Sequence, residues 1–376
     1  MHKWLRGDES PRSTLHHGKQ IIIDSAVVLQ PGMPRVDVTG IKVTIVSGND
    51  MQCITGKRLW HRVCAATEKS TSPLEQYDED ACTAEVQSTL EKLQRQVKSV
   101  PELHDDIKTQ TRHLLYQGCA PLWHAKFDLR EPCYLPPMRI ELKSGADPTR
   151  IKRHYRWTDE QAKFLGKHLV KLVNIGIISH TESEWLCPIV LPRKTDGTWR
   201  LCVDPGTLNA VTVPMTWEVP RIRVLLQDRL AGCSWFAKFD FEAMFWQLPL
   251  HEDSRHLFSF FAGKFGSFSF NRVAMGALNS SVYTQKMLTR IFANTIFRGK
   301  PILENGLFVQ TDDVLLYAHT PEELLELIVV FLRTVMMHNL AVHPDKCLLF
   351  ARELIYCGLH VSAAGVSVDP DRLQAL

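Results

Sequence analysis

Two acidic residues interrupt an apolar stretch in the last quarter of this chain. Residues 307–318 read LFVQTDDVLLYA, so Asp312 and Asp313 stand between two short runs of β-favouring residues. Such short runs favour strands, and aspartate favours turns, so the stretch predicts a tight hairpin with both carboxylates at its tip. Adjacent carboxylates repel each other, and a hard divalent cation would relieve that repulsion. Taken alone, the stretch also fits a solvated turn.

A second acid follows another predicted strand. Residues 233–240 form an apolar run that ends in Asp240. An acid at a strand end is usually a cap or a turn residue. If this strand lies beside the hairpin in one sheet, however, three carboxylates converge at one edge.

The elements around these strands alternate. Helical spacing predicts helices at 279–292 and 322–340, and short apolar runs predict strands at 348–350, 354–359 and 366–368. This order predicts an α+β layer with helices on one face of a sheet.

A cationic hairpin is expected earlier in the chain. Residues 189–203 contain two apolar runs around Asp196-Gly197, which is a strong hairpin signal. The hairpin would carry Lys194 and Arg200. Its cations suit a polyphosphate, and they equally suit a solvated surface hairpin.

The remaining sequence suggests three segments. Residues 1–82 include predicted strands at 20–29 and 40–47, and residues 83–150 combine helical spacing with a proline-rich linker. Composition shifts near residue 150, and an amphipathic helix is predicted at 159–175. We therefore expect a β-rich N-terminal segment at 1–82, a helical connector at 83–150 and the main domain at 151–376.

Composition excludes several classes. The chain has 376 residues, of which 45% are hydrophobic and 23% charged, as in globular proteins, and its net charge of +3 does not by itself predict nucleic-acid binding. The ten cysteines form no CxxC pair, so we expect reduced thiols in an intracellular, cytoplasmic protein. Neither a signal peptide nor a membrane-spanning pattern is evident, and we expect no membrane partner.

Six motifs in one order resemble the reverse transcriptase of Ty3/Gypsy-type LTR retrotransposon polyproteins. They are WLCPIVL from Trp185 with the KTDGTWRLCVD and Leu208-Asn209 that follow, KFDFEAMFWQLP from Lys238, MGALNSSVYTQ from Met275, QTDD from Gln310, HPDKC from His343, and YCGLHVSAAG from Tyr356. Each match is short, and their order and spacing make the resemblance specific.

The resemblance implies a right-hand polymerase with fingers, a ferredoxin-like palm sheet and only the start of a thumb. The implied function is an RNA-directed DNA polymerase within a polyprotein, which adds dNTPs to a primer 3′-hydroxyl with two Mg²⁺ or Mn²⁺ ions. The implied partners are an RNA or DNA template–primer, dNTPs and other polyprotein products, and a virus-like particle is a further expected location. Residues 1–82 lie outside the resemblance. They would be a spacer or a protease remnant, because a protease usually precedes this region in such polyproteins. Residues 21–26 nearly match an aspartic-protease loop, but Ala26 stands in place of glycine, and an ordinary strand end is the favoured interpretation.

The resemblance also assigns roles to individual residues. The implied catalytic residues are Asp240, Asp312 and Asp313, with the carbonyl of Phe241 as a further metal ligand. The implied nucleotide-binding residues are Lys194, Arg200, Phe245, Met275, Gly276, Gln285 and Lys346. The implied nucleic-acid-binding residues are Arg150, Lys152, Arg153 and Gly358. Phe245 would exclude a ribose 2′-hydroxyl by steric contact, which argues against a polymerase that uses rNTPs.

Four positions depart from the family pattern. Gln310 stands where an aromatic residue is usual, Met244 replaces a glycine, Pro205-Gly206 replaces an aromatic–arginine pair, and Met275 replaces an aromatic residue or glutamine. The three acids remain. A catalytically inactive relic that still binds nucleic acid is therefore the alternative hypothesis.

Overall fold

The structure is a computed structural model. It describes residues 84–119, 122, 131–148, 157–193, 197–217 and 222–368, together with three strands nearer the N-terminus. The chain divides into two compact units, which are Met1–Ala81 with His113–Pro121, and Cys82–Arg112 with Leu122–Leu376. The three-segment division expected from the sequence stays a prediction.

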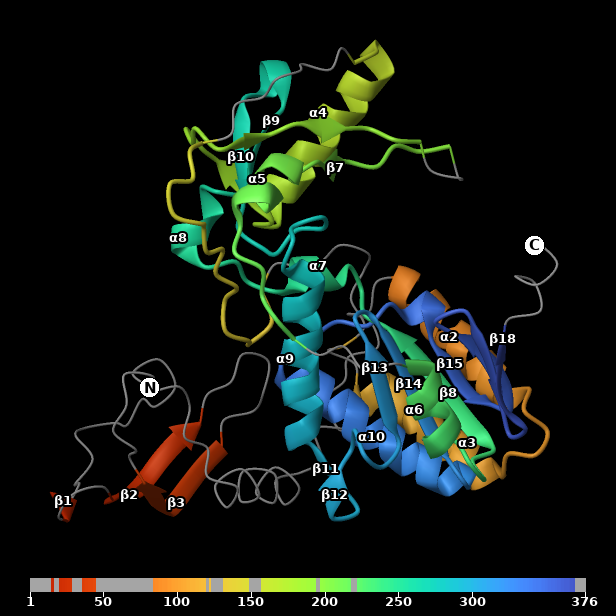
Figure 1. Cartoon of the computed structure of the whole chain (residues 1–376). Helices are drawn as coiled ribbons and strands as arrows, with labels where there is room; N and C mark the ends of the chain where they lie inside the picture. The colour runs from red at the N-terminus through yellow and green to blue at the C-terminus, as the bar shows by residue number, and fades with distance from the viewer. Residues whose placement is uncertain are drawn as a thin grey trace. The chain divides into compact units, whose positions relative to one another are not determined.

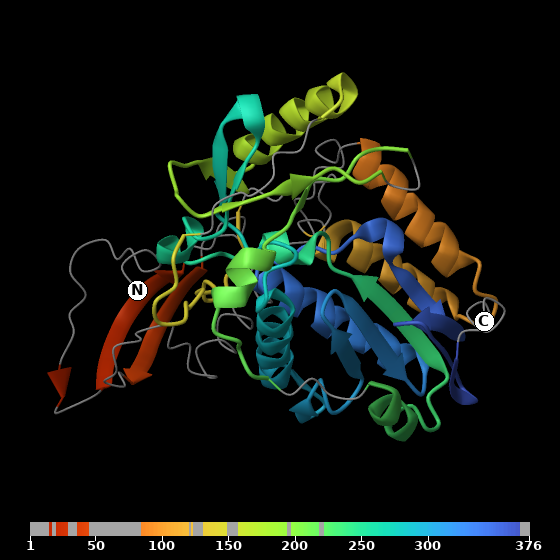
Figure 2. The same cartoon turned by 45° about the horizontal axis from the view of Figure 1, so that its top comes forward.

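The first unit contains a small antiparallel sheet (Figure 2). Its strands are β1 (Leu15–His16), β2 (Gln20–Val28) and β3 (Val36–Thr44), and it also includes the short π-helix η3 (Leu114–Gly118). Both strands predicted here are present, although the second begins several residues earlier than expected. Residues 21–26, the near-match to a protease loop, lie inside β2.

The second unit is built around a four-stranded sheet that we call the central sheet. Its order is β13-β14-β8-β15, and every neighbouring pair is antiparallel. The strands are β8 (Trp235–Asp240), β13 (Leu307–Gln310), β14 (Asp313–Ala318) and β15 (Leu348–Ala351). The predicted adjacency of the 233–240 strand and the hairpin is confirmed.

Two long helices accompany the central sheet. Helix α10 (Pro321–Met337) packs on β14 and β8, and α9 (Ser280–Asn294) packs against β13 (Figure 1). Aromatic rings fill the space between helices and sheet. The ring centroid of Phe331 lies 4.7 Å from that of Phe239 on β8 and 5.8 Å from that of Phe292 on α9. Such contacts add about 0.5–1.5 kcal/mol per pair beyond the burial of apolar area.

A second apolar cluster joins the central sheet to a three-stranded sheet. That sheet consists of β16 (Glu353–Tyr356), β17 (Leu359–Ser362) and β18 (Gly365–Val368). The cluster includes Phe236, Leu315, Tyr317 and Tyr356, together with Leu226 of α6 (Ile222–Arg229). Since side chains alternate along a strand, Lys238, Asp240 and Asp313 project to the same side as this cluster.

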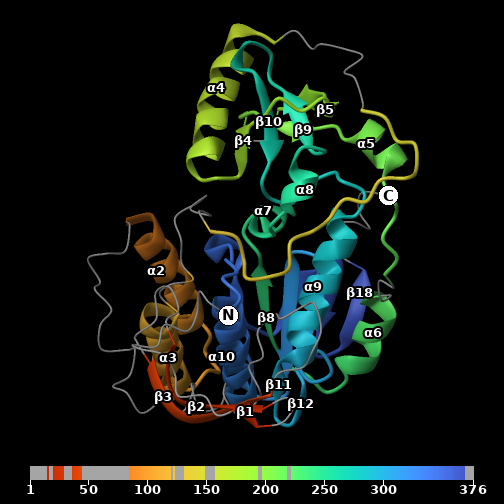
Figure 3. The same ribbon diagram turned by 90° about the vertical axis from the view of Figure 1, so that its left-hand side faces the viewer.

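Another sheet has the order β4-β10-β9-β5 and lies beside α4 (Asp159–Asn174), as Figure 3 shows. Its strands are β4 (Ile178–His180), β5 (Leu186–Cys187), β9 (Ser259–Phe261) and β10 (Ser267–Phe270). A capping box between Thr158 and Gln161 begins α4. The remaining elements of this unit are β6 (Ile189–Val190), β7 (Cys202–Val203), α5 (Gly206–Val211), α7 (Met244–Gln247), α8 (Glu252–Arg255), η5 (Gly263–Phe265), β11 (Ile296–Phe297), β12 (Lys300–Pro301) and η6 (Pro344–Lys346).

Helices α2 (Ala84–Lys98) and α3 (Asp105–His113) come early in the chain. Helix α2 packs on β15 and η6, and it buries Leu90, Leu93 and Val97. Arg352, which follows β15, pairs with Glu102 in the connection between α2 and α3. The segment expected to be a connector therefore contributes to the core of the second unit.

The predicted helices at 159–175, 279–292 and 322–340 are confirmed as α4, α9 and α10. Within the described residues, no helix combines the length and the apolar character that crossing a bilayer requires.

Candidate functional site

The β13–β14 hairpin brings one acid to its tip and places the other in a strand. Gln310 pairs with Asp313, so the two loop residues are Thr311 and Asp312. Thr311 has a φ of +55°, a region that a β-branched residue rarely adopts. The prediction of two carboxylates at the tip was therefore right for Asp312 and wrong for Asp313, which is the first residue of β14.

The third acid lies directly across from this hairpin. Asp240 is the last residue of β8, it is 8% exposed, and its register partner is Asp313. The backbone N–H of Phe241 donates to the carbonyl of Asp312 at 2.9 Å, which fixes the loop against the end of β8. The structure thus brings all three acids to one edge of the central sheet.

A buried glutamine on α9 supports the hairpin. The Gln285 amide donates to the carbonyl of Val309 at 3.1 Å and accepts from the N–H of Thr311 at 2.9 Å. These bonds hold the unusual backbone of Thr311 in place. The sequence assigned Gln285 to nucleotide binding, whereas its 4% exposed side chain is here engaged with the hairpin.

Two lysines pair with two of the acids. Lys346 Nζ lies 2.9 Å from Asp240 Oδ1, and Lys238 Nζ lies 3.1 Å from Asp313 Oδ1. Burial lowers the pKa of Lys346, but its hydrogen bond to Asp240 and the nearby negative charges outweigh burial, so the pKa is raised overall.

Asp312, at the hairpin tip, lies near two other carboxylates. Burial, followed by the charges of Asp240 and Asp313, raises the pKa of its carboxyl, although Lys346 lowers it in part. A cation placed between Asp240 and Asp312 would relieve this repulsion.

The donor chemistry fits a hard divalent cation, because carboxylate oxygens are the ligands that Mg²⁺ prefers. As the side chains stand, no group of three or more His, Cys, Asp or Glu residues in the described part of the chain is close enough to hold a metal ion. In this arrangement the Lys346 ammonium donates a hydrogen bond to one carboxylate oxygen of Asp240. A cation that took this oxygen would displace the Lys346 ammonium from it.

The loop before α9 contains Met275 and Gly276, which the sequence predicts to bind nucleotide. Met275 is 63% exposed, and Gly276 has a φ of +94° with Pro205 close to the position that a Cβ would take. Asn209 clamps this loop, because its amide donates to the Gly276 carbonyl at 2.9 Å and accepts from the Leu278 N–H at 2.8 Å. Sequence reasoning used Asn209 only as part of a motif and missed this role.

The other predicted residues lie in separate places. Phe245 is half-buried on α7, directly after the acid-bearing end of β8, and Arg200 is exposed in the arm that leads into β7. Gly358, with a φ of +76°, forms the β16–β17 turn together with Cys357. Lys194, Arg150, Lys152 and Arg153 lie outside the described residues.

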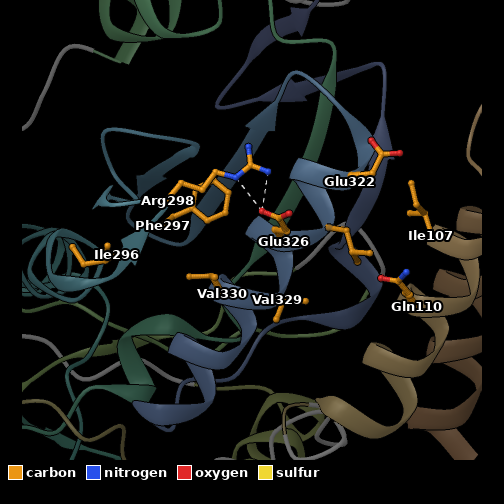
Figure 4. Close-up of a pocket in the computed structure, with 10 residues that line it drawn as sticks. Ile107, Gln110, Ile296, Phe297, Arg298, Glu322, Glu326, Val329 and Val330 are labelled. Atoms are coloured by element: carbon orange, nitrogen blue, oxygen red, sulfur yellow. Dashed lines mark hydrogen bonds and ion pairs between the residues drawn. The ribbon is translucent and has the colours of Figure 1, made fainter. Parts of the chain in front are cut away.

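A cavity of about 470 Å³ lies elsewhere in this unit, lined by residues of α3, β11 and α10. Leu325, Val329 and Val330 provide apolar lining, and Arg298 reaches Glu326 beside them (Figure 4). None of the three acids lines this cavity.

Comparison with known proteins gives consistent matches. Residues 192–361 match the reverse transcriptase (RNA-dependent DNA polymerase) family. The Pol polyprotein from transposon 412 of Drosophila melanogaster is 24% identical over 63% of this chain and 19% of its own length. The Pol polyprotein from transposon gypsy of the same species is 26% identical over 57% of this chain and 20% of its own length. The chain thus spans about a fifth of the length of these relatives.

Solved structures agree on the fold. The foamy viral protease-reverse transcriptase in complex with RNA/DNA hybrid superposes with a TM-score of 0.66 at 19% identity, covering 77% of this chain and 37% of that chain. The expected fingers and palm architecture is thereby confirmed. The central sheet is the palm sheet, and residues 192–361 match the reverse transcriptase family, as the similarity to Pol polyproteins of transposons also indicates.

Proposed function

We propose that this chain supplies the RNA-directed DNA polymerase of a retrotransposon polyprotein. The observation that carries this proposal is the register that sets Asp240 opposite Asp313, with Asp312 in the adjoining loop. The primer 3′-hydroxyl would attack the α-phosphate of a dNTP, and pyrophosphate would leave.

Asp240 and Asp312 would hold two Mg²⁺ ions, with Mn²⁺ as a substitute, and the Phe241 carbonyl would add a ligand. When bound, the ions would activate the attacking oxygen and offset charge on the leaving pyrophosphate. A cation bound at the Asp240 oxygen that Lys346 now contacts would free Lys346. Its ammonium could then donate a proton or a hydrogen bond to the leaving group.

The remaining nucleotide residues would bind and select the substrate. Lys194 and Arg200 neutralise the triphosphate, and Met275 and Gly276 line the pocket. Phe245 stands next to the acid-bearing strand end, where its ring excludes a ribose 2′-hydroxyl.

Template–primer is the proposed macromolecular partner, and the foamy viral neighbour bound to an RNA/DNA hybrid supports this assignment. Arg150, Lys152 and Arg153 would contact phosphates, whose binding weakens as salt rises. The turn at Gly358 would contact the primer strand, because a glycine allows close backbone approach.

The test is dNTP incorporation on a primed RNA template with Mg²⁺ or Mn²⁺. We expect extension by the unchanged protein and by Lys300→Met, which alters an exposed lysine on β12, and none by Asp240→Asn. Circular dichroism would show that every variant is folded. Salt-dependent binding of primer–template without extension would instead support the inactive relic.

A further inference from the structure

Lys238 is a charged residue on an inner strand of the palm sheet. Strand β8 lies between β14 and β15, and its other five residues are buried. The Lys238 side chain is only 25% exposed. A charge in such a place costs free energy unless it is paired and hydrogen-bonded, so the partners of Lys238 decide whether it is tolerated.

Its partners come from two different elements. The Lys238 ammonium lies 3.1 Å from Asp313 Oδ1 on β14 and 3.5 Å from the carbonyl of Ile355 on β16. Lys238 is the register partner of Leu315, which makes Asp313 its diagonal neighbour on the same face. The lysine therefore bridges the catalytic strand pair and the β16–β17 hairpin.

The same hairpin contacts Asp313 in two further ways. The buried Tyr356 hydroxyl donates to the Asp313 carbonyl at 3.2 Å, and Cys357 Sγ lies 3.9 Å from Asp313 Oδ2. Cys357 and Gly358 form a two-residue turn in which both φ angles are positive. Such a turn has a well-defined shape, so fixing its first strand also fixes its tip.

We propose that Lys238 is a positioning residue that locks Asp313 to the β16–β17 turn and thereby holds the primer-side turn at a set place relative to Asp240 and Asp312. This inference rests on the proposed function, because the turn matters only if it guides a primer. Asp313 is then mainly an anchor, which leaves Asp240 and Asp312 as the principal cation ligands.

A direct phosphate contact by Lys238 is the competing explanation, and salt separates the two. Losing one phosphate contact lowers the slope of log affinity against log salt by about one. Losing a positioning contact weakens primer–template binding at every salt concentration and leaves that slope unchanged.

The experiment measures primer–template affinity by fluorescence anisotropy in EDTA, over a series of salt concentrations. The variants are Lys238→Met, Lys238→Arg, Asp313→Asn and the Met/Asn double variant, with Lys300→Met as matched control. We expect Lys238→Met to weaken binding about tenfold with an unchanged slope, which is within the usual range for coupled pairs. Asp313→Asn should weaken binding similarly, the double variant should bind no worse than Lys238→Met, and Lys238→Arg should recover most of the affinity.

Three outcomes overturn the inference: a salt slope that falls by one, additive effects of the two single changes, or wild-type affinity in Lys238→Met. Urea unfolding shows whether every variant is folded. Unfolding of the unchanged protein, Lys238→Met, Asp313→Asn and the double variant also gives an independent coupling free energy. If the unchanged protein extends no primer, the proposed polymerase function fails, while the binding cycle in EDTA still decides the role of Lys238.

Discussion

Asn209 offers the sharpest test of how the nucleotide pocket is held. Its side chain makes two hydrogen bonds to the loop that carries Gly276 and Leu278, at 2.9 and 2.8 Å. Asn209→Ala removes both. At about 1 kcal/mol per hydrogen bond, the loop loses about 2 kcal/mol of ordering free energy.

That loss sets a ceiling on the kinetic effect. If only the ordered loop binds nucleotide, 2 kcal/mol corresponds to a rise of up to about 30-fold in the KM for dNTP. The value of kcat should change little, because Asn209 touches none of the three acids. Asn209→Asp keeps the acceptor for the Leu278 N–H and loses the donor to the Gly276 carbonyl, so its KM should lie between those of the unchanged protein and Asn209→Ala.

Steady-state incorporation on a primed template, at varied dNTP concentration, measures both constants. Asn294→Ala is the matched control, because the Asn294 amide bonds only within its own helix, to the carbonyl of Arg290. An unchanged KM in folded Asn209→Ala, or a loss confined to kcat, would refute the reasoning.

Three further changes test stability. Burial raises the pKa of the Asp312 carboxyl above its ordinary value of 3.8. The folded state therefore gains stability as the pH falls through that raised pKa towards 3.8. Asp312→Asn should be more stable than the unchanged protein at pH 7 and equally stable below pH 3.8, as measured by urea unfolding. Arg352→Ala breaks the pair with Glu102 and should lower the unfolding free energy by about 1 kcal/mol; an unchanged urea midpoint would contradict this. Gly306→Ala, at φ +122° with Leu327 only 2.7 Å from the added Cβ, should cost about 1–3 kcal/mol, and a thermal midpoint equal to wild type would show the site to be tolerant.

Local patterns in the sequence predicted the elements that carry the acids. Two short apolar runs predicted β13 and β14, and a third predicted β8, because a buried strand needs a short run of apolar, β-favouring residues. The long helices were predicted equally well from the helical spacing of their apolar residues.

The position of Asp313 was not predictable in this way. Turn propensity favours a loop made of both aspartates, yet the loop begins at Thr311, whose backbone is held by Gln285 from α9. A side chain 26 positions earlier in the chain therefore decides the register of the hairpin. The Lys238–Asp313 pair was missed for the same reason, because it exists only once β8 and β14 are aligned.

The β4-β10-β9-β5 sheet was missed because its strands are very short and their partners are distant in the sequence. Strand β4 pairs with β10, and Ser179 on β4 bonds to Asn271, 92 positions later. A strand of three residues leaves little periodic signal, so only the tertiary contacts establish it.

Helix α2 is synthesised long before β15, the strand on which it packs. Glu102, just beyond α2, meets Arg352 across 250 positions of sequence. A ribosome that adds about 5–20 residues per second takes about 10–50 s to make the intervening chain. Throughout that interval Leu90, Leu93 and Val97 have no β15 to cover them. The apolar face of α2 therefore stays uncovered by β15 until almost all of the palm has been made, so this part of the palm core can form only late in synthesis.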